Sequence, residues 1–186
     1  MNYKIYQSKL IIDNHQSFIN NCKKAYLSIN KKFGEINLTW DHYRYNFFSV
    51  TSSSILFYEL FKELNFYIRE YIKDDRPLWM QSWLNYHPKD SVEQVLAEHG
   101  HLYPYHGYIS IDPQNTTTIF NNGLKIKNKP GQVYIGPGRN WDENNEDWDH
   151  KVVINRKSSN PRITIAFDIS DKIDIEHKEL SFFPLF

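Results

Sequence analysis

Cysteine is almost absent from this chain of 186 residues, which contains Cys22 alone. A single cysteine excludes an intrachain disulfide, so the fold must rest on a buried core, and the composition is compatible with a reducing cytosol. Net charge is absent as well, because 22 Lys and Arg residues balance 22 Asp and Glu residues. That balance argues against partners such as nucleic acid or an anionic membrane surface.

Long apolar runs are missing too. No segment approaches the roughly 18 apolar residues of a membrane span, and residues 1–6 lack the apolar run of a signal peptide. We therefore expect a soluble cytoplasmic protein. Aromatic residues are plentiful, with 12 Phe, 13 Tyr and 5 Trp, which favours a packed domain. At this length we expect a single domain over 1–186, with a helical support region at 1–76, a core at 77–170 and a tail at 171–186.

The N-terminal region carries helical patterns. Residues 10–12 suit a short first strand, after which Asp13 or Asn14 is placed to cap a helix that runs to about residue 28. A second helix is predicted over 55–72, because three serines precede it and leucines recur every four residues along one face. Both helices are expected to cover the core.

After Pro77 the pattern changes to short runs separated by Asn, Asp, Pro and Gly. Pro130 followed by Gly131 suits a type II turn. Short strands at this spacing, preceded by helices, predict an α+β, mainly β fold: a double-stranded β-helix, or cupin-like jelly roll, with the N-terminal helices packed on one sheet. The expected strands span 78–85, 92–98, 108–111, 116–120, 124–127, 132–135, 151–155 and 162–168.

The last expected strand divides its side chains between two environments. Ile163, Ile165 and Phe167 share one face, which we expect to contact the helices, whereas Arg162 and Thr164 share the other and face the barrel interior. An inward arginine is costly unless it meets an anion, and a planar guanidinium binds a carboxylate through two parallel hydrogen bonds. The strand therefore predicts a carboxylate receptor; a surface ion pair at its start is the alternative.

Three histidines are candidate metal ligands. His99 and His101 are two residues apart, which places both imidazoles on one strand face, and His150 opens a later strand. Neutral imidazoles favour iron, zinc, nickel or copper over calcium or magnesium. His106 is an alternative to His101 as the additional ligand. A His-x-His pair alone is often just two solvated histidines, but the order of pair, third histidine and Arg162 strengthens the metal hypothesis.

Short segments that carry a family resemblance are Trp83–Asn85, His99–His101, Gly107–Ile111, Thr118–Phe120, Gly131–Gly138, His150–Val152 and Arg162–Thr164. Together they make residues 80–169 similar to the 2-oxoglutarate and Fe(II)-dependent oxygenases of the prolyl-hydroxylase-like branch, and to small members of it encoded by bacteriophages. The resemblance implies that His99 and His150 hold iron. It also implies that Arg162 and Thr164, as an Arg-x-Ser-like pattern, bind the distal carboxylate of 2-oxoglutarate. One departure is His101, which stands where the family usually has Asp or Glu and leaves the ligand set one unit more positive.

Other candidate pocket residues are Asn85 and Tyr108 for the co-substrate, and Trp83, Tyr103, Tyr105 and Trp141 for the substrate. For each aromatic residue, ordinary core packing is the alternative. The polar segment 139–149 is either a substrate lid or a solvated loop. The apolar end at 180–186 is expected to dock on this domain or on a second copy, which leaves monomer and homodimer open.

The resemblance implies a hydroxylase that uses Fe(II), 2-oxoglutarate and O2 and forms succinate and CO2. The expected substrate is a peptidyl side chain, with proline as one candidate, or a small molecule. The alternative is a non-redox cupin-like barrel that binds metal or carbohydrate, such as a phage structural or attachment module; a phage-encoded protein would act in the host cytoplasm. A hydrolytic zinc site is disfavoured, because no carboxylate base is paired with the histidines.

Overall fold

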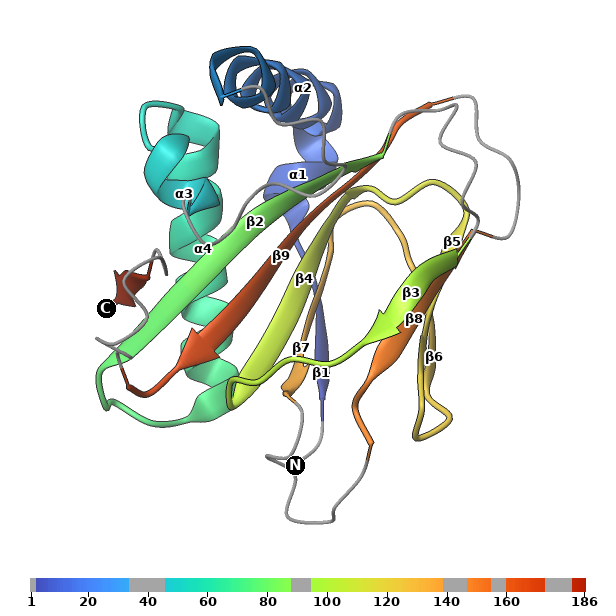
Figure 1. The fold of residues 1–186 in the computed structure, drawn as a ribbon. Coiled ribbons are helices and arrows are strands. Elements are labelled where there is room, and N and C mark those ends of the chain that lie inside the picture. The colour runs from blue at the N-terminus through green and yellow to red at the C-terminus, as the bar shows by residue number, and fades with distance from the viewer. Residues whose placement is uncertain (1–2, 34–45, 88–94, 139–146, 155–159, 173–181) are drawn as a thin grey trace.

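The computed structural model describes residues 3–33, 46–87, 95–138, 147–154, 160–172 and 182–186. Its strands form two antiparallel sheets, and the helices lie against one face of the larger sheet, on the side away from the smaller sheet (Figure 1). This is the layered arrangement that the sequence predicts. The predicted lid residue Trp141 lies outside the described residues.

The larger sheet has six strands in the order β1-β7-β4-β9-β2-β10, and the smaller has four in the order β3-β8-β5-β6. In the larger sheet these are Lys4–Gln7 (β1), Gln132–Pro137 (β7), Tyr105–Asp112 (β4), Arg162–Ser170 (β9), Leu78–His87 (β2) and Phe183–Leu185 (β10). In the smaller sheet they are Val95–His99 (β3), His150–Ile154 (β8), Thr116–Phe120 (β5) and Lys125–Lys127 (β6). Each strand expected after Pro77 is present, with ends that differ by a few residues.

The helices are α1 (Lys9–Asp13), α2 (His15–Phe33), α3 (Phe47–Val50) and α4 (Ile55–Ile72). The prediction of a first strand at residues 10–12 is wrong, because the Ser8 side chain accepts a hydrogen bond from the Ile11 N–H and starts α1 there. The first strand is β1 instead, which pairs with β7. Helix α4 begins after Ser54 as predicted and ends where Lys73 adopts the left-handed conformation, with φ of 55°.

Side chains on the helix side of the larger sheet form the hydrophobic core. Tyr86 of β2 stacks on Tyr26 of α2 with ring centroids 4.4 Å apart. Phe167 of β9 lies over Gly107 of β4, where an added Cβ would stand 2.2 Å from Phe167 Cζ. Gly107 therefore leaves room for the phenylalanine ring, and the two strands can pair with Phe167 fully buried.

Two further predictions concern turns and ends. The Gln132 N–H donates to the Lys129 carbonyl oxygen, and Gly131 has φ of 76°, which fits the predicted type II turn. The C-terminal strand β10 pairs with β2, so the apolar end docks on its own domain. Among the described residues, no helix combines the length and apolar character needed to cross a membrane.

Candidate metal centre and anion site

The inner face of the larger sheet, which looks toward the smaller sheet, collects polar side chains. Strand pairing places His106 opposite Asp168, and Ser110 opposite Thr164, on the β4–β9 ladder. All four are buried. Side chains from the smaller sheet close over this face, as Phe120 of β5 does over Tyr134 of β7 with ring centroids 5.1 Å apart. A buried polar interior of this kind is unusual and marks a candidate site.

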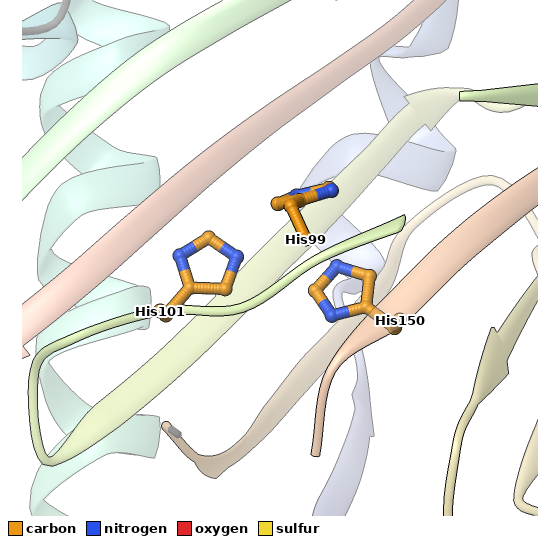
Figure 2. A group of neighbouring side chains, drawn as sticks. All are labelled: His99, His101 and His150. Carbon is orange, nitrogen blue, oxygen red and sulfur yellow. The ribbon is translucent and has the colours of Figure 1, made fainter. Parts of the chain in front are cut away.

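Three imidazoles meet at one edge of this interior. His99 ends β3 and pairs directly with His150, which begins β8, and His101 lies two residues beyond β3. Figure 2 shows the three rings gathered together, and one possible ligand atom from each lies within 4.8 Å of the others. Ring centroids are 4.6 Å apart for His99 and His150 and 5.4 Å for His101 and His150. His99 is exposed, while the other two are buried.

Each of the three rings has a nitrogen that is available to bind a metal ion. Nδ1 of His99 lies 2.9 Å from the Ala97 carbonyl oxygen, which only accepts, so Nδ1–H donates and Nε2 is left for a ligand bond. His101 Nε2 and His150 Nδ1 are both buried with no hydrogen-bond partner. Orphaned buried nitrogens are rare, and a bound cation would satisfy them.

The protonation of His99 and His150 suits a metal. Burial lowers the pKa of His99, with a further lowering from His101, although a hydrogen bond to Ala97 opposes it. Burial likewise lowers the pKa of His150 well below its ordinary value, and the neighbouring imidazoles add to the effect. Neutral imidazoles are the form that coordinates metal ions.

His106 and Asp168 lie behind His101. Asp168 Oδ1 is 2.8 Å from Nδ1 of His101 and 3.1 Å from Nδ1 of His106, so one carboxylate oxygen serves both rings. Burial would raise the pKa of Asp168, but the charge interaction and hydrogen bond with His101, joined by His106, outweigh burial and lower the pKa. Burial lowers the pKa of His106 to about 3, and its Nε2 has no hydrogen-bond partner.

The geometry of the two rings bears on the predicted choice between His101 and His106. His101, His106 and Asp168 form a second group that could hold a metal ion. The two rings, however, are stacked, with centroids 3.4 Å apart and planes within 11°. An ion placed between the two rings would lie out of each ring plane by up to half of the 3.4 Å separation. That displacement is most of the length of a metal–nitrogen bond, which is about 2.0–2.1 Å. The lone pair through which a ring nitrogen binds a metal, however, lies in the ring plane. The stacking therefore favours His101 over His106 as the third ligand beside His99 and His150, and this choice stays a prediction.

Arg162 lies at the other end of β9. Its side chain is buried, Nη1 lies 3.3 Å from Nδ1 of His87, and Nε has no hydrogen-bond partner. Across the residues that the structure describes, no carboxylate forms an ion pair with it. Burial lowers the pKa of Arg162 to about 10, so the guanidinium keeps its charge at neutral pH. The surface ion pair considered from the sequence is not formed with any described residue.

Where the structure describes the surroundings of Arg162, the groups near it are neutral. Burial, followed by the charge of Arg162, lowers the pKa of His87 to about 4, so His87 accepts the arginine hydrogen bond as a neutral ring. Asn85 Nδ2 donates to Thr164 Oγ1 at 3.5 Å, a long hydrogen bond. Tyr108, which interacts with the arginine charge, donates to Asn128 Oδ1 at 3.0 Å. A buried cation among neutral partners is costly without an anion, and this is the property of an anion receptor.

The four predicted substrate residues are placed differently. Trp83 lies on the inner face of β2, with its ring centroid 6.0 Å from that of His101. Tyr103 is half-buried and packs against Phe182, with centroids 5.3 Å apart. Tyr105 lies on the helix side of β4, where it contacts Tyr71 of α4, and this placement goes against its predicted role in substrate binding. Trp141 lies outside the described residues.

Two buried residues of the site were not among the predicted ones. Asp168 shares the inner face of β9 with Arg162 and Thr164, so strand alternation continued for four more residues would have indicated it. His87 is two residues beyond Asn85 on β2, so the same alternation would have placed it on the same face as Asn85, and the structure pairs it with Arg162. In both cases the signal was present in the sequence pattern.

Comparison with known proteins gives a fold but no sequence relative. No family model matches the chain, and no curated protein matches it. Solved structures do match. The viral collagen prolyl hydroxylase of Paramecium bursaria Chlorella virus-1, in a 2-oxoglutarate complex, superposes with a TM-score of 0.60 at 13% identity, over 91% of this chain and 95% of that chain. The chain has the fold of the 2-oxoglutarate and Fe(II)-dependent oxygenases.

Other matches widen the chemistry found on this fold. A protein of Caulobacter crescentus assigned to the 2OG-Fe(II) oxygenase family has a TM-score of 0.53 at 12% identity, over 98% of this chain and 86% of that chain. SnoN, a non-heme α-ketoglutarate-dependent epimerase of nogalamycin biosynthesis, has a TM-score of 0.54 at 7% identity, over 91% and 76%. The predicted double-stranded β-helix is confirmed, and so is the resemblance to these oxygenases and their prolyl-hydroxylase-like branch at the level of the fold.

Proposed function

We propose that this protein is an Fe(II)- and 2-oxoglutarate-dependent oxygenase that hydroxylates a C–H bond of its substrate. The observation that carries the proposal is a cluster of three imidazoles together with a buried guanidinium that pairs with no described carboxylate, both on the interior of one double-stranded β-helix. A metal and a dicarboxylate would satisfy both. The fold matches support the proposal, and because one fold serves several reactions, the side chains must carry the rest.

The donor set fits iron. His99, His101 and His150 would hold the ion, because each ring nitrogen available for coordination is deprotonated or unpartnered. His99 is the exposed member of the three, so solvent and substrate would reach the ion from the side of His99. When bound, iron and 2-oxoglutarate together supply the decarboxylation by O2 that yields succinate, CO2 and a hydroxylated substrate. The chain itself orients the imidazoles and keeps water from the interior.

The co-substrate fits the other end. Arg162 would bind the distal carboxylate through parallel guanidinium hydrogen bonds, with the Thr164 hydroxyl as an additional donor. His87 directs Nη1 and Tyr108 lies near the arginine charge, so the guanidinium is held in place before a ligand arrives. Such preorganisation lowers the entropy lost on binding.

The substrate proposed is a peptidyl side chain, with proline as the first candidate, or a small molecule. One fold match is a collagen prolyl hydroxylase, which makes a peptidyl proline the first substrate to test. Trp83 lies beside His101, where its ring could pack against an extended peptide or a flat molecule. The exposed position of His99 leaves the metal end accessible to a bulky substrate.

The proposal is tested by titrating metal-free protein anaerobically with Fe(II) and then with 2-oxoglutarate. A weak visible charge-transfer band is expected when both are bound, and admission of O2 should consume 2-oxoglutarate and form succinate. His150→Ala should abolish iron uptake. His15→Asn is the matched control, since His15 bonds the Ile111 carbonyl on the helix side and should leave iron uptake unchanged. Bound iron with no band and no succinate would contradict the proposal.

A second candidate is a non-redox barrel that binds a metal without O2 chemistry. It is favoured by one observation: the ligand group of three histidines contains no carboxylate, and three imidazoles also suit zinc. The titration separates the candidates. A non-redox protein would bind zinc through His99, His101 and His150 but would show no affinity for 2-oxoglutarate, and Arg162 would then need another anion.

A further inference from the structure

The candidate metal centre has a carboxylate close by, although its three ligands are all histidines. Asp168 is buried, its Oδ1 lies 2.8 Å from Nδ1 of His101, and it stands on the inner face of β9. His101 thus connects the carboxylate to the position where an ion would bind. The carboxylate that the sequence lacks at position 101 is therefore present in the structure, one hydrogen bond farther from the ion.

We propose that Asp168 is a positioning residue for the metal centre, acting through His101 to supply the negative charge that a direct carboxylate ligand would otherwise bring. This inference rests on the proposed function, because it assumes that an ion binds His101. Since an ionised carboxylate only accepts, His101 Nδ1–H must donate to it, and the unpartnered Nε2 becomes the ligand atom. Such a carboxylate fixes the ring and makes it a stronger ligand.

His106 explains how Asp168 stays in place. Its Nδ1–H donates to the same Oδ1 at 3.1 Å, and its ring stacks on His101. Asp168 therefore receives two donors from two buried rings, which compensates for the burial of its charge. The stacked rings also hold His101 from behind, so that it cannot turn its Nε2 away from the side of His99 and His150.

A direct role for Asp168 as a ligand, with His101 and His106, is the competing arrangement. It would require the stacked rings to separate, because one ion cannot lie in both ring planes. It would also leave His99 and His150 without an ion, although one possible ligand atom of each lies within 4.8 Å of one of His101. The indirect role keeps the stacked pair of rings and the hydrogen bond from His101 to Asp168 as they are.

The test uses Co(II) alone as the probe, on the full chain and without 2-oxoglutarate. Asp168→Asn keeps a carbonyl oxygen that can accept from His101 but removes the charge, and it should weaken Co(II) binding about 10- to 100-fold in competition with a chromophoric chelator. The Fe(III)/Fe(II) potential of this variant should move upward. Asp171→Asn, three residues along, loses an ion pair with Arg76 and should leave Co(II) affinity unchanged.

A rescue distinguishes charge from folding. His101→Asp combined with Asp168→Asn places the carboxylate directly among the ligands, so Co(II) affinity should recover to near that of the parent. Thermal unfolding of each metal-free variant checks that it is folded. Unchanged Co(II) affinity in folded Asp168→Asn would overturn the inference, as would failure of the folded double variant to recover.

These outcomes are separate from those of the proposed function. A protein that binds Co(II) with the predicted dependence on Asp168 but never consumes 2-oxoglutarate would retain this inference and lose the oxygenase proposal. If succinate forms but Asp168→Asn changes neither the Co(II) affinity nor the iron potential, the oxygenase proposal is retained and this inference is lost.

Discussion

The two faces of β9 differ in chemistry although all nine residues of the strand are buried. The helix side consists of Ile163, Ile165, Phe167 and Ile169, each with no exposed surface. The inner side consists of Arg162, Thr164, Ala166, Asp168 and Ser170. Burial of the first set stabilises the fold by removing apolar surface from water, while burial of the second set opposes folding unless partners are supplied. Stability and proposed chemistry are thus divided between the faces of one strand.

This division suggests that the polar side chains on the inner face of β9 serve to bind a ligand. Asp168 has two protein donors, whereas His87 is the one hydrogen-bond partner of Arg162 among the described residues and the arginine Nε is unpartnered. The arginine end is therefore the less satisfied part of the inner face and the one that a ligand would stabilise most. Substitutions on the two faces should have opposite effects, and the following predictions rank them by size.

The largest effect is expected from Phe167→Ala on the helix side. The ring is fully buried over Gly107, so its removal leaves a cavity and should reduce the free energy of unfolding by about 3–5 kcal/mol. Urea denaturation of the metal-free protein measures this change. The folded fraction should bind 2-oxoglutarate in the presence of metal with unaltered affinity. A large loss of affinity in the folded protein would show that the two faces are not independent.

Arg162→Met should have the opposite pattern. Methionine keeps much of the apolar stem, so stability of the ligand-free protein should be unchanged or higher, because an incompletely paired buried charge is removed. Affinity for 2-oxoglutarate should fall by about 2–4 kcal/mol, since the distal carboxylate would lose its partner. Calorimetric titration with 2-oxoglutarate in the presence of Zn(II) tests this, and equal affinity in the two proteins would end the assignment of Arg162.

Strand alternation explains how much of the fold was predictable. Ile163, Ile165 and Phe167 were assigned to the helix side from sequence alone, and the structure places them there. Residues 10–12 were misassigned because three apolar residues in a row fit either a strand or a buried helical turn. The Ser8 cap decides for a helix, and that requires knowing where the chain leaves β1.

The candidate site was predictable only where a pattern repeats. The sequence places His99 and His101 two residues apart and His150 at the start of a later strand, and the structure brings these three side chains together. The stacking of His106 on His101 was not predictable, because the segment between them, with Pro104, is not a regular strand. The side of the sheet on which Tyr105 lies was not predictable for the same reason, because it depends on where β4 begins.

His87 gives a smaller, pH-dependent effect at the arginine end. Its folded-state pKa of about 4 lies below the ordinary 6.5, so the unfolded chain takes up the proton first as the pH falls. The stability that depends on neutral His87 is therefore complete above pH 6.5 and is lost between 6.5 and 4. At about 1.4 kcal/mol per pKa unit, the loss approaches ~3 kcal/mol.

His87→Gln should remove this part of the pH dependence. The difference in unfolding free energy between pH 7 and pH 4.5 should be smaller in the metal-free variant than in the parent, while the other histidines contribute equally to both. Urea denaturation at the two pH values gives the comparison. Parallel pH profiles would mean that His87 is not held neutral by burial and by Arg162.

The smallest effect separates two hydroxyls that face each other across β4 and β9. Thr164→Val removes a predicted donor to the co-substrate and should weaken 2-oxoglutarate binding by about 0.5–1.5 kcal/mol, the usual contribution of one hydrogen bond. Ser110→Ala is the matched control, because Ser110 pairs with Thr164 in the ladder and its Oγ is buried with no hydrogen-bond partner. Its loss should leave affinity unchanged and raise stability slightly. If calorimetry instead shows the larger loss of affinity for Ser110→Ala, the carboxylate binds nearer β4 than β9, and the pairing of Arg162 with Thr164 must be revised.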